Sequence, residues 1–295
     1  MSTTQLPGPE LVREPTDEGY LEREGVRLHW LEWAPPGTPE PPAILLLHGL
    51  SSNARYWERV ARRMTNRRLV ALDQRSHGLS DAPPTGYGLD VLAADAAHAI
   101  RALGLNRPVV VGHSWGGTVA LEVGATPGKP VSAVAVMDGP IASISERITW
   151  EDASRMMQPP LPRYASLEEA FEANRQMLGE AWGEDLQAFV KAGLRRDGDS
   201  WMLTLTAPVR LQILEQLYQF RPEVALAAID APLLVGLAAA DTAMRAWKEE
   251  GARRVQEIHP DADIRWYDSR HDIPLIRPGE IATDLETLAR RAVSV

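Results

Sequence analysis

A serine flanked by glycines is the strongest candidate for chemistry in this chain. Ser114 is the centre of Gly-His-Ser-Trp-Gly at residues 112–116, a G-x-S-x-G pattern that follows the apolar run 109–111. Small neighbours let the chain turn tightly from a strand into a helix, which raises the hydroxyl above the edge of a sheet. The pattern predicts a serine nucleophile; the alternative is a glycine-rich turn with a solvated serine.

A serine hydroxyl is a weak nucleophile at neutral pH, so it needs a histidine base and an acid that orients the base. With a nucleophile in such a turn, the chain order is serine, acid, histidine. His271 fits this order, because it follows the last strand-like run, 264–267, and precedes the last helical pattern. We expect His271 to be the base. The histidines that precede or flank the serine, His48, His77 and His113, are expected to be structural.

Two aspartates are candidates for the acid. Asp241 follows the strand-like stretch 232–240, and Asp138 follows the strand-like stretch 133–137. Both positions belong to the carboxyl edge of a sheet, where ligand chemistry gathers in open α/β sheets. We expect Asp241 to be the acid and keep Asp138 as the alternative, whose other role would be to cap the segment that follows it.

The tetrahedral intermediate of acyl transfer needs hydrogen-bond donors aimed at its oxyanion. One expected donor is the backbone N–H of Trp115, the residue after the nucleophile. The other is the backbone N–H of Leu50, in the loop after the apolar run 43–47.

Short apolar runs alternate with helical patterns along most of the chain. Runs of this length suit strands that are covered on both faces, as in a parallel sheet. The alternation therefore predicts a doubly wound, mostly parallel α/β fold. The expected strands are 21–33 (a hairpin), 43–47, 69–72, 109–111, 131–137, 232–235 and 264–267, and the expected helices include 56–64, 89–103, 118–124 and 278–291.

The alternation stops after Pro140. Residues 141 to about 224 contain helix-like segments and no convincing buried strand, and this stretch is too long for a connection without structure of its own. We expect an α-helical cap inserted into the sheet. The predicted division is a first core part at 1–140, the cap at 141–225 and a second core part at 226–295.

Composition excludes several other classes of protein. The 295 residues are 44% hydrophobic, which is enough for a large core, and the net charge of −9 argues against nucleic-acid binding. The absence of cysteine excludes disulfides, thiolate zinc sites and a cysteine nucleophile. Neither a secretory signal nor a membrane span is recognisable, so we expect a cytoplasmic protein. Only three of the 31 basic residues are lysines, a bias typical of genomic base composition.

Together these motifs resemble the α/β-hydrolase superfamily over about residues 25–291. Residues 47–50 look like its oxyanion loop and residues 112–117 like its nucleophile turn. Residues 73–80 look like its D-x-R-G-H-G-x-S segment, with Ser76 where glycine is common. The family's glycine three residues before the acid is replaced by Ala238. The resemblance implies an eight-stranded type of sheet with an inserted cap.

The resemblance is to the branch that holds carboxylesterases, lactonases, cofactor-free haloperoxidases, carbon–carbon bond hydrolases and epoxide hydrolases. Epoxide hydrolases of this fold use an aspartate nucleophile, so Ser114 disfavours that activity. We expect a serine hydrolase of carboxylic esters or lactones of hydrophobic small molecules, without metal or organic cofactor. The alternatives are a carbon–carbon or amide hydrolase, or a slow ligand receptor. Oligomeric state is left open.

Specificity is expected to come mostly from the cap. Its aromatic and methionine side chains predict an apolar acyl or alcohol pocket, because ligand pockets favour domain junctions and apolar walls. The pocket candidates are Trp57, Trp150, Met156, Tyr164, Trp182 and Tyr218.

Overall fold

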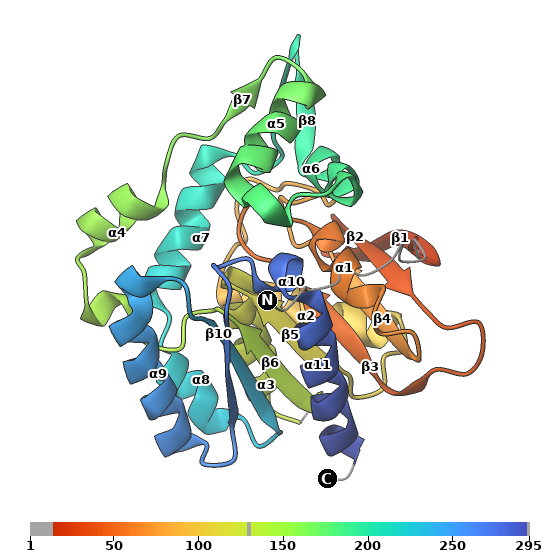
Figure 1. Ribbon diagram of the computed structural model, residues 1–295, viewed down its shortest axis with the longest axis vertical. Helices are drawn as coiled ribbons and strands as arrows, with labels where there is room; N and C mark the ends of the chain where they lie inside the picture. Colours follow the sequence, from red (N-terminus) through yellow and green to blue (C-terminus); the bar gives the residue numbers. More distant parts are fainter. Residues whose placement is uncertain (1–13, 129–130, 294–295) are drawn as a thin grey trace, which may run out of the picture.

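Eight strands form the large sheet of the protein, for which a computed structural model describes residues 14–128 and 131–293 (Figure 1). Their order is β1-β2-β4-β3-β5-β6-β10-β11. β2 pairs antiparallel with both β1 and β4, whereas every pair from β4 to β11 is parallel. The predicted mostly parallel sheet is therefore confirmed. The strands are β1 (Asp17–Arg23), β2 (Val26–Trp33), β3 (Glu40–Leu47), β4 (Arg67–Leu72), β5 (Val109–His113), β6 (Ala133–Met137), β10 (Leu233–Ala238) and β11 (Asp263–Tyr267).

Each central strand sends alternate side chains to two separate hydrophobic cores. In β3, Ile44 and Leu46 belong to one core, while Leu45 and Leu47 belong to the other. Because helices cover both faces, the central strands are apolar throughout, as a buried parallel sheet requires. The first core contains η1 (Ala54–Trp57), α1 (Glu58–Ala61), α10 (Ile273–Ile276) and α11 (Pro278–Val293); the second contains α2 (Leu89–Ala102), α3 (Trp115–Ala125), α8 (Pro222–Ala228) and α9 (Arg245–Ile258).

A long insertion separates β6 from β10 and contributes no strand to the large sheet among the described residues. Most of its elements lie together at the top of Figure 1, above the large sheet. It consists of η2 (Ile144–Glu146), α4 (Trp150–Met157), β7 (Arg163–Tyr164), α5 (Leu167–Leu178), η3 (Gly179–Ala181), η4 (Glu184–Leu186), α6 (Gln187–Ala192), β8 (Leu194–Asp197), β9 (Ser200–Leu203), α7 (Ala207–Gln219) and α8. We propose that this insertion is the cap, with the boundaries 141–225; α8 then crosses the second boundary.

The insertion is not purely helical as the sequence pattern predicts. β7, β9 and β8 form a small antiparallel sheet of three strands. These strands have two to four residues and are partly exposed, so they carry no apolar run that would mark a buried strand.

α9 is a helix that the apolar pattern does not indicate. Its buried residues are Lys248, Gly251, Ala252 and Val255, which have helical spacing but include only one large apolar side chain. This helix packs beside the end of β10 and brings Lys248 to the carboxyl edge of the sheet. Within the described residues, no helix has the length and apolar character needed to cross a membrane.

Candidate active site

Ser114 lies on the tight turn between β5 and α3. Its backbone has φ 53° and ψ −122°, a conformation that is rare for residues other than glycine. The turn depends on close backbone contacts: a Cβ on Gly112 would lie 2.0 Å from the carbonyl oxygen of Gly116, and one on Gly116 would lie 2.5 Å from that of His48. The sequence pattern therefore predicts the local geometry of residues 112–116 correctly.

Gly112→Ala is expected to destabilise the protein and to lower any activity that depends on Ser114. The new methyl group would meet the backbone of α3, which can move only if the turn moves, and overpacking of this kind costs roughly 1–3 kcal/mol. Thermal unfolding should show a lower Tm. Gly37→Ala is the matched control, because nothing lies within 4 Å of its added Cβ. An unchanged Tm for Gly112→Ala would contradict this reading of the turn.

His271 lies in the loop between β11 and α10, and its side chain is 51% exposed. Its Nδ1 is 2.7 Å from Oδ2 of Asp138, whose carboxyl group is buried. Because the ionised carboxylate can only accept, Nδ1 carries the proton and donates it to Asp138. Nε2 is then free to accept a proton from another group, as a general base must.

The expectation that Asp241 orients His271 is wrong, and the alternative, Asp138, takes that place. Asp138 follows the last residue of β6 directly, and its Oδ1 accepts a hydrogen bond from the N–H of Ala238 at 2.9 Å. Asp241 lies three residues beyond the end of β10, and its Oδ2 is 3.5 Å from Nζ of Lys248. Among the described residues, no hydrogen bond or ion pair joins Asp241 to His271, whereas Asp138 contacts the histidine directly.

The hydrogen bond changes the pKa of both partners. Burial raises the pKa of Asp138, but its hydrogen bonds with His271, the Ala238 N–H and Lys248 outweigh this effect and lower the pKa below its usual value. Partial burial lowers the pKa of His271, but the hydrogen bond and charge of Asp138 outweigh it and raise the pKa above 6.5. His271 therefore becomes neutral, and able to act as a base, only as the pH rises through this raised pKa.

The two amides expected to bind an oxyanion are the backbone N–H groups of Leu50 and Trp115. Trp115 is the first residue of α3, where the N–H has no partner within the helix. Among the described residues, neither amide donates to another group of the protein. Leu50 also borders a cavity that contains Ser114. Their role as oxyanion donors remains a prediction.

The loop that carries Leu50 is held by two buried histidines. Nε2 of His77 accepts a hydrogen bond from the Ser51 N–H at 3.1 Å, while its Nδ1 donates to the carbonyl oxygen of Arg75. Burial lowers the pKa of His77 to about 3, so its ring stays neutral. His48 donates from Nδ1 to Gly49 O and accepts from the Gln74 N–H at Nε2. Both histidines are therefore structural here.

Ser76 occupies a conformation that favours glycine. Its φ is 66°, and the residue is fully buried. The segment around it is held by Asp73, whose carboxylate accepts from the N–H groups of Ala54 and Leu79 and from His29. The turn therefore accommodates serine at the position where the resemblance leads one to expect glycine.

The loop that carries His271 is held by two residues on other elements. His113, the last residue of β5, donates from Nε2 to the carbonyl oxygen of His271 at 3.0 Å. The Tyr56 hydroxyl lies 3.2 Å from the same nitrogen and donates a hydrogen bond to Oδ1 of Asp272 at 3.3 Å. Burial lowers the pKa of His113 to about 3. Tyr56 begins the helix expected at residues 56–64, and no sequence signal marks its contact with this loop.

Two cavities share Ser114 and His271 in their walls. The smaller, of about 300 Å³, also has polar groups from Ser52, Asn53 and Asn174. The larger, of about 640 Å³, lies between the end of β6, α9 and the insertion. Its apolar wall consists of Pro140, Ile141, Ile144, Ile148, Met156, Met157, Leu217, Ala243, Met244 and Trp247.

Only two of the six expected pocket residues border these cavities: Tyr164 the smaller one and Met156 the larger one. The other four border neither of these two cavities. Trp57, the last residue of η1, is fully buried in the core, and Trp182 packs against Phe171. Trp150 and Tyr218 pack against each other, with ring centroids 5.3 Å apart. Aromatic residues at helical spacing mostly fill cores, and these four do so.

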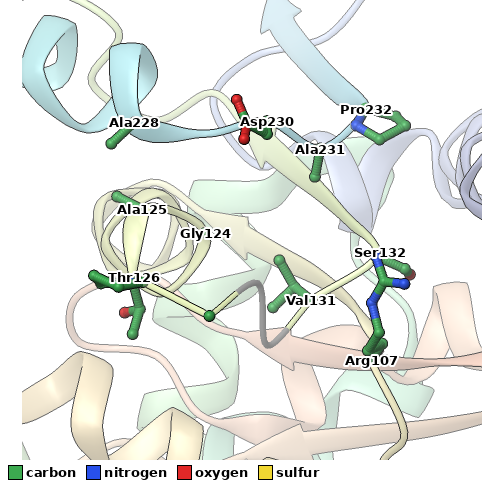
Figure 2. A pocket seen from close by; sticks show the side chains of 12 residues that line it. Arg107, Gly124, Ala125, Thr126, Val131, Ser132, Ala228, Asp230, Ala231 and Pro232 are labelled. Carbon is green, nitrogen blue, oxygen red and sulfur yellow. The ribbon is translucent and has the colours of Figure 1, made fainter. Parts of the chain in front are cut away.

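A further cavity, of about 400 Å³, shares no lining residue with the two cavities at Ser114. Figure 2 shows the side chains that border it. Arg107, Ser132 and Asp230 border it, and these residues precede β5, β6 and β10 respectively. They therefore lie at the amino ends of three parallel strands, whereas Ser114 and Asp138 follow the carboxyl ends of β5 and β6.

Comparisons with known proteins agree with this architecture. Epoxide hydrolase 1 of Caenorhabditis elegans is 35% identical over 114 residues, which are 38% of this chain and 28% of that protein. N-formylmaleamate deformylase of Pseudomonas putida is 25% identical over 87% of this chain and 90% of its own length. A thioesterase domain from the curacin biosynthetic pathway superposes with a TM-score of 0.77 and 18% identity, over 92% of this chain and 99% of that domain.

The matched stretch is a minor part of several relatives. In three epoxide hydrolases it covers 28%, 34% and 25% of the protein's length, so these relatives carry much sequence outside the match. The model of the alpha/beta hydrolase family matches residues 44–284, which include Ser114, Asp138 and His271. This match covers most of the chain and spans the whole of the described site, and the chain therefore belongs to the alpha/beta hydrolase family.

Proposed function

We propose that this protein is a serine hydrolase that cleaves carboxylic esters or lactones of hydrophobic small molecules. The observation that carries the proposal is the 2.7 Å hydrogen bond from His271 to buried Asp138, at a cavity wall that also holds Ser114. This bond fixes the tautomer that a base needs, and it belongs to the recurrent arrangement of serine, histidine and aspartate.

In the proposed reaction, Oγ of Ser114 attacks the carbonyl carbon while Nε2 of His271 removes its proton. Asp138 stabilises the imidazolium, and the N–H groups of Leu50 and Trp115 bind the oxyanion of the tetrahedral intermediate. The C–O bond to the alcohol breaks as His271 returns the proton to the leaving oxygen. Water then attacks the acyl-enzyme with the same base, which releases the acid and restores Ser114.

The larger cavity supports a hydrophobic substrate. Its lining is mostly aliphatic and sulfur-containing side chains, with Trp247 as its aromatic member. Burial of apolar surface stabilises by roughly 25 cal/mol per Å², so an acyl or alcohol group that fills this cavity gains affinity that a small charged group lacks.

Amide hydrolysis is the second candidate activity. The N-formylmaleamate deformylase relative matches 87% of this chain, so the likeness covers the insertion as well as the sheet. The same serine and histidine can attack an amide, with His271 protonating the leaving nitrogen.

A hydrolysis panel tests the proposal. We expect p-nitrophenyl esters and lactones with neutral hydrophobic groups to be turned over with higher kcat/KM than short charged esters, and faster than matched anilides. Preferential cleavage of the anilides would replace the proposal with the amide activity. Stoichiometric release of one product followed by a stable adduct would replace it with a receptor role.

A further inference from the structure

Lys248 contacts the acid of the proposed triad directly. Its Nζ lies 2.9 Å from Oδ1 and 3.0 Å from Oδ2 of Asp138 and 3.3 Å from the carbonyl oxygen of Ala238. Asp241 adds a more distant contact at 3.5 Å. The lysine side chain is 8% exposed and the Asp138 side chain 2% exposed, so their ion pair is shielded from water. Charges in such surroundings interact more strongly than exposed charges do.

The positive charge beside Asp138 comes from a lysine, which is a rare residue in this chain. Lys248 is one of only three lysines among the 31 basic residues of the chain. Most other positions that need a positive charge carry arginine, whose planar guanidinium is larger and binds carboxylates through a two-pronged face. The compact ammonium of lysine can contact Asp138 from one side, while Oδ2 also accepts from His271.

We propose that Lys248 is a positioning residue, whose ammonium holds the Asp138 carboxylate against His271 and offsets its charge, so that His271 acts as a base at lower pH. The proposal rests on the proposed serine hydrolase activity. Lys248 forms no part of the chemistry itself, because its Nζ is occupied by Asp138, Ala238 and Asp241.

The charges around His271 set the sign of the effect. Asp138, at the end of β6, and Asp272, beside His271 on its own loop, both raise the pKa of His271, whereas Lys248 on α9 lowers it. His113, at the end of β5, is neutral because burial lowers its pKa to about 3. Loss of the lysine charge should therefore raise the pKa of His271 further, so that the neutral imidazole forms only at higher pH.

Lys248→Met tests the proposal through the pH dependence of kcat/KM for a neutral p-nitrophenyl ester. The acidic limb of the profile should move to higher pH by on the order of one unit, because one charge near the imidazole is lost. Activity should recover toward the wild-type value at alkaline pH. Lys248→Arg retains the charge and should keep the limb at the wild-type position, even where its larger head group lowers kcat.

Lys191→Met is the matched control for net charge. Lys191 is exposed on α6, and its replacement should leave the limb unchanged. A Lys248→Met enzyme whose kcat/KM falls equally at every pH would overturn the proposal, because that result indicates a purely structural lysine. Wild-type behaviour of Lys248→Met would overturn it as well.

The titration of His271 can also be followed by NMR without any substrate. His271→Gln identifies its ring signal, and the midpoint of that signal should rise in Lys248→Met relative to wild type and Lys191→Met. An unchanged midpoint overturns the proposal for Lys248 even where esters are hydrolysed. A raised midpoint in a protein that hydrolyses no ester would retain the electrostatic role of Lys248 and reject the proposed activity instead.

Discussion

Ser114→Ala is expected to lower kcat/KM for p-nitrophenyl esters by about 10⁴-fold or more, the range found when a serine nucleophile is removed. The hydroxyl is the only group on this turn that can form an acyl-enzyme. The loss should appear mainly in kcat, because both cavities and their walls remain for substrate binding. A fluorophosphonate probe should add its mass to the wild type but not to Ser114→Ala.

The fold should tolerate this change. Alanine already contains the Cβ that the strained backbone accommodates, so the Tm should stay within a few degrees of the wild type. Ser154→Ala, on α4, is a matched control whose hydroxyl donates only to the carbonyl oxygen of Glu151. A folded Ser114→Ala protein that hydrolyses esters at the wild-type rate would refute the proposed mechanism.

The nucleophile turn is predictable because it is local. Residues 112–116 carry their own steric requirement, since the glycines must allow backbone contacts of the kind seen between Gly112 and Gly116. His271 is predictable for a related reason: chain order and position after the last strand confine it to one edge of the sheet. The strands are predictable from apolar runs, because a strand that is buried on both faces must be apolar at nearly every position.

The acid is less predictable, because two strands end near the histidine. β6 and β10 are neighbours, and both are followed by aspartates. In the sequence, Asp138 and Asp241 differ mainly in the number of residues between each aspartate and the strand before it. The expectation for Asp241 is wrong because of that difference. Lys248 is missed as well, because its helix lacks a clear apolar stripe and nothing in the sequence marks this lysine as buried.

The cavity walls are predicted worst. Trp150, Trp182 and Tyr218 have the composition of a pocket, but their rings pack against other parts of the insertion. Which face of a cap helix meets the sheet depends on the whole path of residues 141–225. The actual wall includes Ile141, from the loop after β6, which no cap pattern singles out.

Asp138→Asn is expected to lower kcat/KM by roughly 10⁴-fold, as loss of the orienting carboxylate does in serine hydrolases of this kind. The asparagine amide has the same shape but no charge, so it neither stabilises the imidazolium nor enforces the proton on Nδ1 of His271. It also leaves the buried ammonium of Lys248 without its main partner, so circular dichroism should accompany the kinetics to establish the folded fraction.

Asp241→Asn is the matched comparison, and it separates the two aspartates. Asp241 is 35% exposed and touches Lys248 only at 3.5 Å, while Lys248 keeps both contacts with Asp138. Its replacement should therefore cost far less activity than that of Asp138. The opposite ranking would mean that Asp241 moves onto His271 during turnover. Because both variants remove one negative charge near the same lysine, the difference between them reports the contacts that Asp138 alone makes, with His271 and the Ala238 N–H and at closer range with Lys248, rather than the net charge of the site.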